Sequence, residues 1–130
     1  MPTHGPNTRQ AGANAVVDRL DLGSTNASAQ LVLLSSGAAV VATLPMSAPP
    51  TNAFGDADTN GRAVANPITS DSNAAGGTVA TFALRDRDNE GIVLGTVTLA
   101  GGGGDLIASA LTIPAGATVS AGSVAYNFAQ

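Results

Sequence analysis

Short runs of aliphatic and β-branched residues, each ended by residues that favour turns, constrain this fold more than any other feature of the sequence. Gln30–Leu34 and Ala39–Leu44 are separated by a Ser-Ser-Gly turn, which predicts a β-hairpin. Thr78–Arg85 and Ile92–Leu99 flank a charged turn and predict a second hairpin. Because consecutive strands usually pair with each other, the two hairpins indicate an antiparallel sheet.

The C-terminal third continues the strand pattern. Gly101–Gly104 is expected to be a flexible break between strands. The next strand is expected to present on one face Ile107, Ser109, Leu111 and Ile113. After a turn at residues 114–116, a terminal strand would present on one face Val124, Tyr126 and Phe128. Six or more strands with one helix predict an all-β fold, either a β-sandwich or a jelly-roll-like barrel.

One helix is predicted near the N-terminus, at about residues 10 to 21. Its apolar residues have the spacing of a single helical face: Ala13, Val16, Val17 and Leu20. Asn7 or Thr8 could cap its start and Gly23 could end it. Residues 1–10, with prolines at positions 2 and 6, are expected to form an extended arm, followed by a single domain over residues 11–130.

The segment from residue 45 to residue 76 is expected to be a long surface loop with one or two short edge strands. It is rich in Pro, Asn, Asp, Gly and Ser, and its apolar residues are confined to short islets. Pro45, Pro49 and Pro50 prevent it from continuing a central strand.

The composition limits both the core and the partners of the chain. A length of 130 residues favours one domain, and three Phe and one Tyr supply few large groups for its core, so association with other subunits would add stability. The net charge of −4 and the absence of Lys argue against nucleic-acid binding. No apolar stretch is long enough to span a membrane, and the N-terminus lacks the pattern of a signal peptide, so synthesis in the cytoplasm is expected.

The inventory of reactive side chains predicts a protein that is not an enzyme. There is no Cys, and His4 is the only His, so a Ser-His-Asp or Cys-His system would depend on one base in the arm. Gly101–Gly104 is not followed by the Lys that a phosphate-binding P-loop needs. We therefore expect no catalytic residues and no cofactor.

Two acidic clusters have the spacing of calcium ligands. Asp56, Asp58 and Asn60, followed by Gly61, match the opening of an EF-hand loop, but its twelfth position is Pro67 where Glu is needed. A polar loop held by Asx turns is the favoured interpretation, and an irregular calcium site is the alternative. A second acidic cluster comprises Asp86, Asp88 and Glu90, and a solvated turn is favoured there.

The order of several segments resembles a known group of proteins. These segments are LPMSAPPTNAFG at 44–55, ANPITS at 65–70, TFALRDRD at 81–88 and GATVSAGSVAYNF at 116–128. Together they resemble small Ala-, Thr- and Gly-rich virion proteins of tailed bacteriophages, in particular capsid decoration or cement proteins. The resemblance extends over about residues 11–129 and rests on composition and loose spacing.

The resemblance implies a structural protein on the outer surface of the phage head. Its partner would be the major capsid protein, and the chain would form a homo-oligomer, a dimer or a trimer, on that surface. We expect the arm and the central loop to bind the partner, through Pro2, His4, Pro6, Arg9, Pro49, Pro50 and Phe54.

Two other classes of function stay open at this point. Another virion component, such as a tail-tube or fibre-associated subunit, would share the same compositional bias. A carbohydrate-binding adhesin module usually presents aromatic rings in a shallow site, and this chain has few rings to present.

Overall fold

The computed structural model describes residues 5–127, which form one helix and nine strands. In chain order these are α1 (Pro6–Arg19), β1 (Gln30–Leu34), β2 (Val40–Pro45), β3 (Arg62–Val64), β4 (Gly77–Thr78), β5 (Thr81–Arg85), β6 (Gly91–Leu99), β7 (Leu106–Ala108), β8 (Thr112–Ile113) and β9 (Ala125–Asn127). The predicted β-rich class with a single N-terminal helix is confirmed over these residues.

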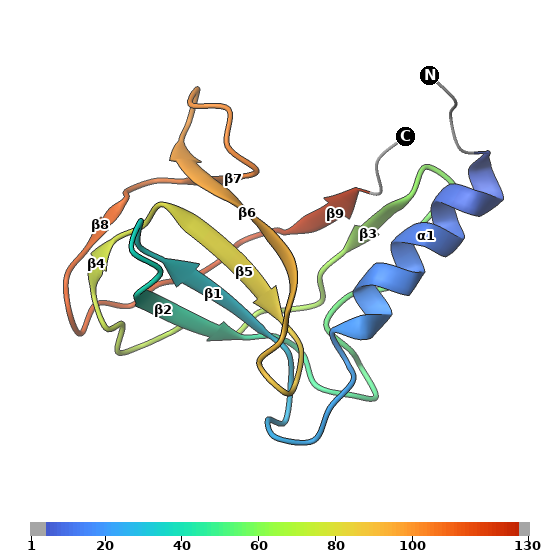
Figure 1. The fold of residues 1–130 in the computed structure, drawn as a ribbon, viewed down its shortest axis with the longest axis horizontal. Coiled ribbons are helices and arrows are strands. Elements are labelled where there is room, and N and C mark those ends of the chain that lie inside the picture. The colour runs from blue at the N-terminus through green and yellow to red at the C-terminus, as the bar shows by residue number, and fades with distance from the viewer. Residues whose placement is uncertain (1–4, 128–130) are drawn as a thin grey trace.

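The strands form one curled five-stranded sheet and two small ribbons (Figure 1). The sheet has the order β2-β1-β5-β6-β7 and is antiparallel except for the β6–β7 pair, which is parallel. The ribbons are β3–β9 and β4–β8. The sheet curls into a half-barrel, and the connection from β8 to β9 passes behind it (Figure 1).

Both predicted hairpins are confirmed. β1 pairs with β2 so that Leu31 lies opposite Leu44, and β5 pairs with β6 so that Leu84 lies opposite Val93. The second hairpin is shorter at its start than predicted, because Thr78 belongs to β4 and pairs with β8 instead.

The single strand predicted from Ile107 to Ile113 is wrong. β7 and β8 occupy this region as two short strands in different sheets, with β7 beside β6 and β8 beside β4. The alternation of apolar residues continues through the segment, but a shared alternation does not require that every residue pairs with the same neighbour.

The four consecutive glycines allow an unusually short connection between the parallel strands β6 and β7. Such strands usually need a crossover of about a dozen residues or more. Here residues 100–105 are enough, because Gly102 and Gly104 pass so close to Thr98 that a Cβ at either position would lie within 3.0 Å of its side chain. The Gly104 amide also donates to the Thr98 hydroxyl over 2.9 Å. The predicted flexible break is therefore a closely packed turn.

The helix begins four residues earlier than predicted. α1 begins at Pro6, with Gly5 as its N-cap residue, so residues 6–10 of the predicted arm are helical. A proline is tolerated at the first helical position because its missing N–H has no partner there. The helix ends at Arg19, before the predicted end at Gly23. Residues 1–4 of the predicted arm lie outside the described residues.

The predicted apolar face of the helix is confirmed. Ala13, Val17 and Leu20 are buried and Val16 is half-buried. This face packs against the β3–β9 ribbon, to one side of the five-stranded sheet (Figure 1). Within residues 5–127, no helix is long and apolar enough to cross a membrane.

The segment 45–76 is not the surface loop that was predicted, although it contains the expected short strand, β3. Its apolar islets belong to the core cluster, through Met46, Ala53, Phe54, Ala57, Ala63 and Ala74. These residues pack with the helix and with the inner face of the half-barrel. Small Ala side chains allow the backbone of the segment to approach the core closely, which local composition alone does not reveal.

Candidate functional site

Six aspartates share one structural role in this protein: their carboxylates accept hydrogen bonds from main-chain N–H groups. They are Asp21, Asp58, Asp71, Asp86, Asp88 and Asp105. A carboxylate that accepts from a main-chain N–H satisfies a donor for which the sheet provides no partner. Much of the acidic charge of the chain therefore stabilises its own loops.

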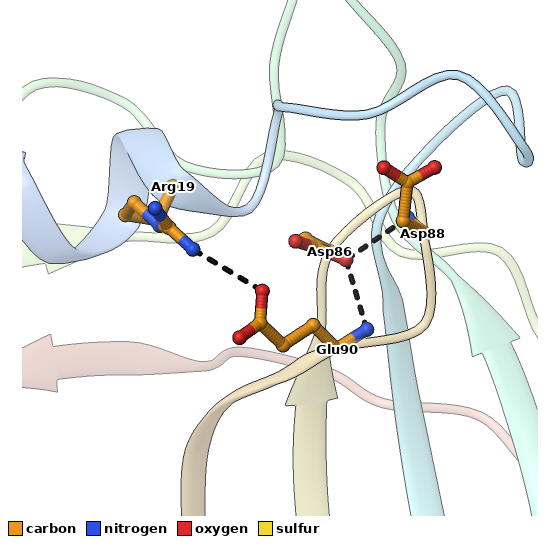
Figure 2. A network of polar contacts seen from close by, with 4 residues as sticks. All are labelled: Arg19, Asp86, Asp88 and Glu90. Atoms are coloured by element: carbon orange, nitrogen blue, oxygen red, sulfur yellow. Dashed lines mark hydrogen bonds and ion pairs between the residues drawn. The ribbon is translucent and has the colours of Figure 1, made fainter.

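The turn between β5 and β6 shows this role most clearly (Figure 2). Asp86 is 4% exposed, and its Oδ1 accepts from the amides of Asp88 and Glu90, each over 2.9 Å. The Asp86 amide donates in turn to the Glu90 carbonyl. Asp86 thus holds the turn closed from within, as an Asx-type turn does.

Asp88 binds the connection between α1 and β1. Its Oδ1 accepts from the amides of Ser24 and Thr25, over 3.0 and 3.1 Å. These hydrogen bonds, led by the one from Ser24, lower the pKa of Asp88. Gly23 makes this approach possible, because a Cβ there would lie 2.7 Å from the Asp88 Cγ, and its φ is +114°.

Arginine side chains and main-chain groups reinforce the same junction. Arg87 donates from its Nε to the Asn26 carbonyl and from its amide to the Leu22 carbonyl. Arg19, in the last turn of α1, pairs with Glu90 over 3.3 Å (Figure 2). The prediction of a solvated turn is therefore wrong: the turn is docked on residues 19–26.

The predicted calcium loop at residues 56–61 is built around Asp58. Its Oδ1 accepts from the amides of Asn60 and Arg62, over 2.9 and 3.1 Å, which is the Asx-turn arrangement. Asp56 and Asn60 are exposed. In residues 5–127, no group of three His, Cys, Asp or Glu side chains lies close enough to hold a metal ion.

The predicted partner-binding residues have different environments. Phe54 is 5% exposed and belongs to the core, so its assignment to a binding surface is wrong. Pro6 is exposed at the first turn of α1, and Arg9 donates to the Thr59 carbonyl. Pro49 and Pro50 are exposed and joined by a cis peptide bond. Pro2 and His4 lie outside the described residues.

A burial effect opposite to that at Asp88 occurs at Asp21, in the segment that follows α1. Burial raises the pKa of Asp21, although the hydrogen bond that its Oδ1 accepts from the Ala53 amide over 2.9 Å lowers it. Burial also raises the pKa of Tyr126, which packs against the core from β9.

A cleft that the sequence did not predict lies inside the half-barrel. It has a volume of about 780 Å³ and separates β7 from residues 117–125. Its floor consists of apolar side chains from β1, β2 and β6, including Leu31, Leu33 and Val97. Its signal in the sequence is weak, because the second half of the lining consists mostly of Ala, Ser, Thr and Gly.

The opposite face of the sheet exposes aliphatic side chains. Val32 lies opposite Ala83, and Ala83 lies opposite Leu94, so these residues share the face that points away from the core. Leu94 is 72% exposed, and Ile107 on β7 is 57% exposed. This face presents apolar groups to a neighbour without a charged side chain between them.

Comparison of the chain with protein-family models, curated proteins and solved structures found no match.

Proposed function

We propose that this protein is a non-catalytic virion protein that binds the outer surface of the major capsid protein lattice of a tailed phage and stabilises the head. The observation that supports this most strongly is the use of the aspartates. Because their carboxylates accept from main-chain N–H groups, they stabilise the fold and are poorly placed to exchange protons with a substrate.

The surface that remains is suited to broad, weak contact. With 11% charged residues against a usual value of about 25%, it consists largely of small polar and aliphatic groups. The exposed side chains of Leu94 and Ile107 belong to this surface. Many copies on a repeating lattice would hold strongly even if each contact were weak, because multivalency raises the effective concentration.

The finer predictions about architecture and assembly form part of the proposal. We infer that the functional form is an oligomer, a dimer or a trimer, located on the capsid surface of the virion. The curled sheet is compatible with the predicted jelly-roll-like barrel if its open side is closed on assembly. The scarcity of large core groups supports association, since partner contacts would add buried surface.

The test is binding to phage heads. Empty heads assembled from the major capsid protein encoded beside this gene would be mixed with the purified chain and separated on a density gradient. We expect the chain to sediment with the heads at saturable occupancy and to raise their melting temperature. Heads that carry none of the chain would contradict the proposal, and cryo-electron microscopy showing it on the tail would favour the tail-subunit alternative.

A truncation tests the predicted arm within the same experiment. Residues 1–4 can be deleted without removing the Gly5 carbonyl, which accepts the first helical hydrogen bond, from Arg9. We expect the truncated chain to keep its melting temperature and to bind heads more weakly. Full occupancy would show that residues 1–4 do not contribute to binding.

A further inference from the structure

The cleft inside the half-barrel has walls made partly of backbone. In an extended segment, side chains alternate between two sides, so a cleft that meets side chains alone would be lined by every second residue. Here every residue from 105 to 110 borders the cleft on one side, and every residue from 117 to 125 borders it on the other. Main-chain atoms of both segments therefore face the cleft.

Each of these segments is paired only on the side away from the cleft. β7 is the edge strand of the sheet and pairs with β6 alone. On the other wall, Val119 exchanges hydrogen bonds with Asp71, and the Val124 carbonyl accepts from the Ala65 amide. Within the described residues, no strand occupies the space between the two walls. The half-barrel thus has an open position bounded by two backbone edges.

We propose that this open position accepts an extended, uncharged segment of the major capsid protein, which adds a strand to the edge of β7. The inference rests on the proposed function, because it names the contact through which the chain would bind the head. Main-chain hydrogen bonds supply affinity in strand addition, and alternate side chains supply specificity. Here the inward side chains of the segment would meet Leu33, Leu106 and Val119.

Charge favours this occupant over a second copy of the chain. Asp105 is the only charged residue that borders the cleft, at the start of β7. It suits a segment that is neutral, or that carries a basic residue at this end. A second copy would bring a net charge of −4 to the same carboxylate.

The polar groups of the walls favour a peptide over an aliphatic small molecule. The lining includes hydroxyl groups, among them Ser109, Ser120 and Ser123, in addition to the backbone. An aliphatic molecule would bury these groups without hydrogen bonds, at a loss for each polar group. An extended peptide offers its own N–H and C=O groups at the spacing of a strand.

Photo-crosslinking on heads tests the inference. The photoreactive residue benzoylphenylalanine would replace Ser109 on one wall, Ser120 on the other, and Leu94 on the opposite face as a matched control. All three positions are exposed, so the substitutions should leave the fold intact. After irradiation on heads, mass spectrometry identifies the crosslinked peptide, and gradient sedimentation measures occupancy separately.

We expect Ser109 and Ser120 variants to crosslink to one contiguous segment of the major capsid protein, and the Leu94 variant not to crosslink to that segment. Occupied heads with crosslinks at position 94 alone would overturn the cleft inference and leave the proposed function standing. Crosslinks between copies of this chain would also overturn it, in favour of self-association. Heads without bound chain would overturn both proposals.

A blocking substitution gives a second, independent measurement. Ser120→Trp places a large ring in the cleft, and Leu94→Trp places the same ring on the opposite face. We expect Ser120→Trp to bind heads at least ten-fold more weakly, with both variants keeping the melting temperature of the wild type. Equal binding by the two variants would overturn the inference, as would native mass spectrometry showing an aliphatic molecule retained by the purified wild-type protein.

Discussion

Gly23 is the residue at which the connection between α1 and β1 comes closest to the β5–β6 turn. We expect Gly23→Ala to destabilise the protein by about 1–3 kcal/mol through overpacking, in addition to the strain of its positive φ. The added methyl group would meet both the side chain and the main-chain nitrogen of Asp88. Urea denaturation of the variant and the wild type measures the difference.

Gly101→Ala is the matched control for this effect. Gly101 also has a positive φ, of +87°, but no atom lies within 4 Å of the position of its Cβ. Its substitution should produce only the backbone strain, about 1–2 kcal/mol. Equal losses in the two variants would show that the close approach of Gly23 to Asp88 adds nothing to stability.

Asp88 should give the protein a pH-dependent stability. Its pKa is lowered from 3.8 in the folded state, so the stability that its ionised form contributes is present above pH 3.8. This contribution is lost as the pH falls through the folded-state pKa, which lies below 3.8. We expect Asp88→Asn to be less stable than the wild type at pH 7 and the two stabilities to converge in acid.

Asp21 provides the control with the opposite sign. Burial raises its pKa above 3.8, so its protonated form stabilises the fold below pH 3.8 and this contribution is lost as the pH rises through the folded-state pKa. Asp21→Asn should therefore gain stability relative to the wild type as the pH rises. Parallel pH profiles for Asp88→Asn and Asp21→Asn would contradict both assignments.

At the scale of elements, the segment 45–76 contributes to the core rather than to the surface. Phe54→Ala should therefore lower the free energy of unfolding by about 3–5 kcal/mol, because it leaves a cavity among buried side chains. Thermal and chemical denaturation would measure this loss. Leu94→Ala removes an exposed side chain and should change stability by no more than about 0.5 kcal/mol. A stable Phe54→Ala variant that binds heads weakly would restore Phe54 to the partner surface.

The hairpins and the helical face were predictable because they depend on neighbours in the sequence. The spacing of Ala13, Val17 and Leu20 specifies one face of α1, and residues 30–45 carry two strands with their turn between them. The start of α1 was misplaced because Pro6 was interpreted as part of an extended arm, although proline also fits the first position of a helix.

At the scale of the whole molecule, the small core makes the stability of the chain depend on association. If the functional form is a dimer or a trimer, mass action should raise the melting temperature as the protein concentration increases. Calorimetry over a hundred-fold range of concentration, with sedimentation velocity at each point, would measure this. A constant melting temperature for a species of monomer mass would contradict the predicted oligomer in the absence of heads.

The sequence alone determined the β-rich class, the two hairpins and the apolar face of the helix, because each depends on residues close together in the chain. Only the tertiary structure decided which groups the aspartates bind and where the cleft lies. Asp88 and Thr25 are 63 residues apart, and β7 and residues 117–125 meet across the cleft only after the sheet has curled. A local pattern specifies which elements form, whereas contacts between distant segments depend on how these elements pack together.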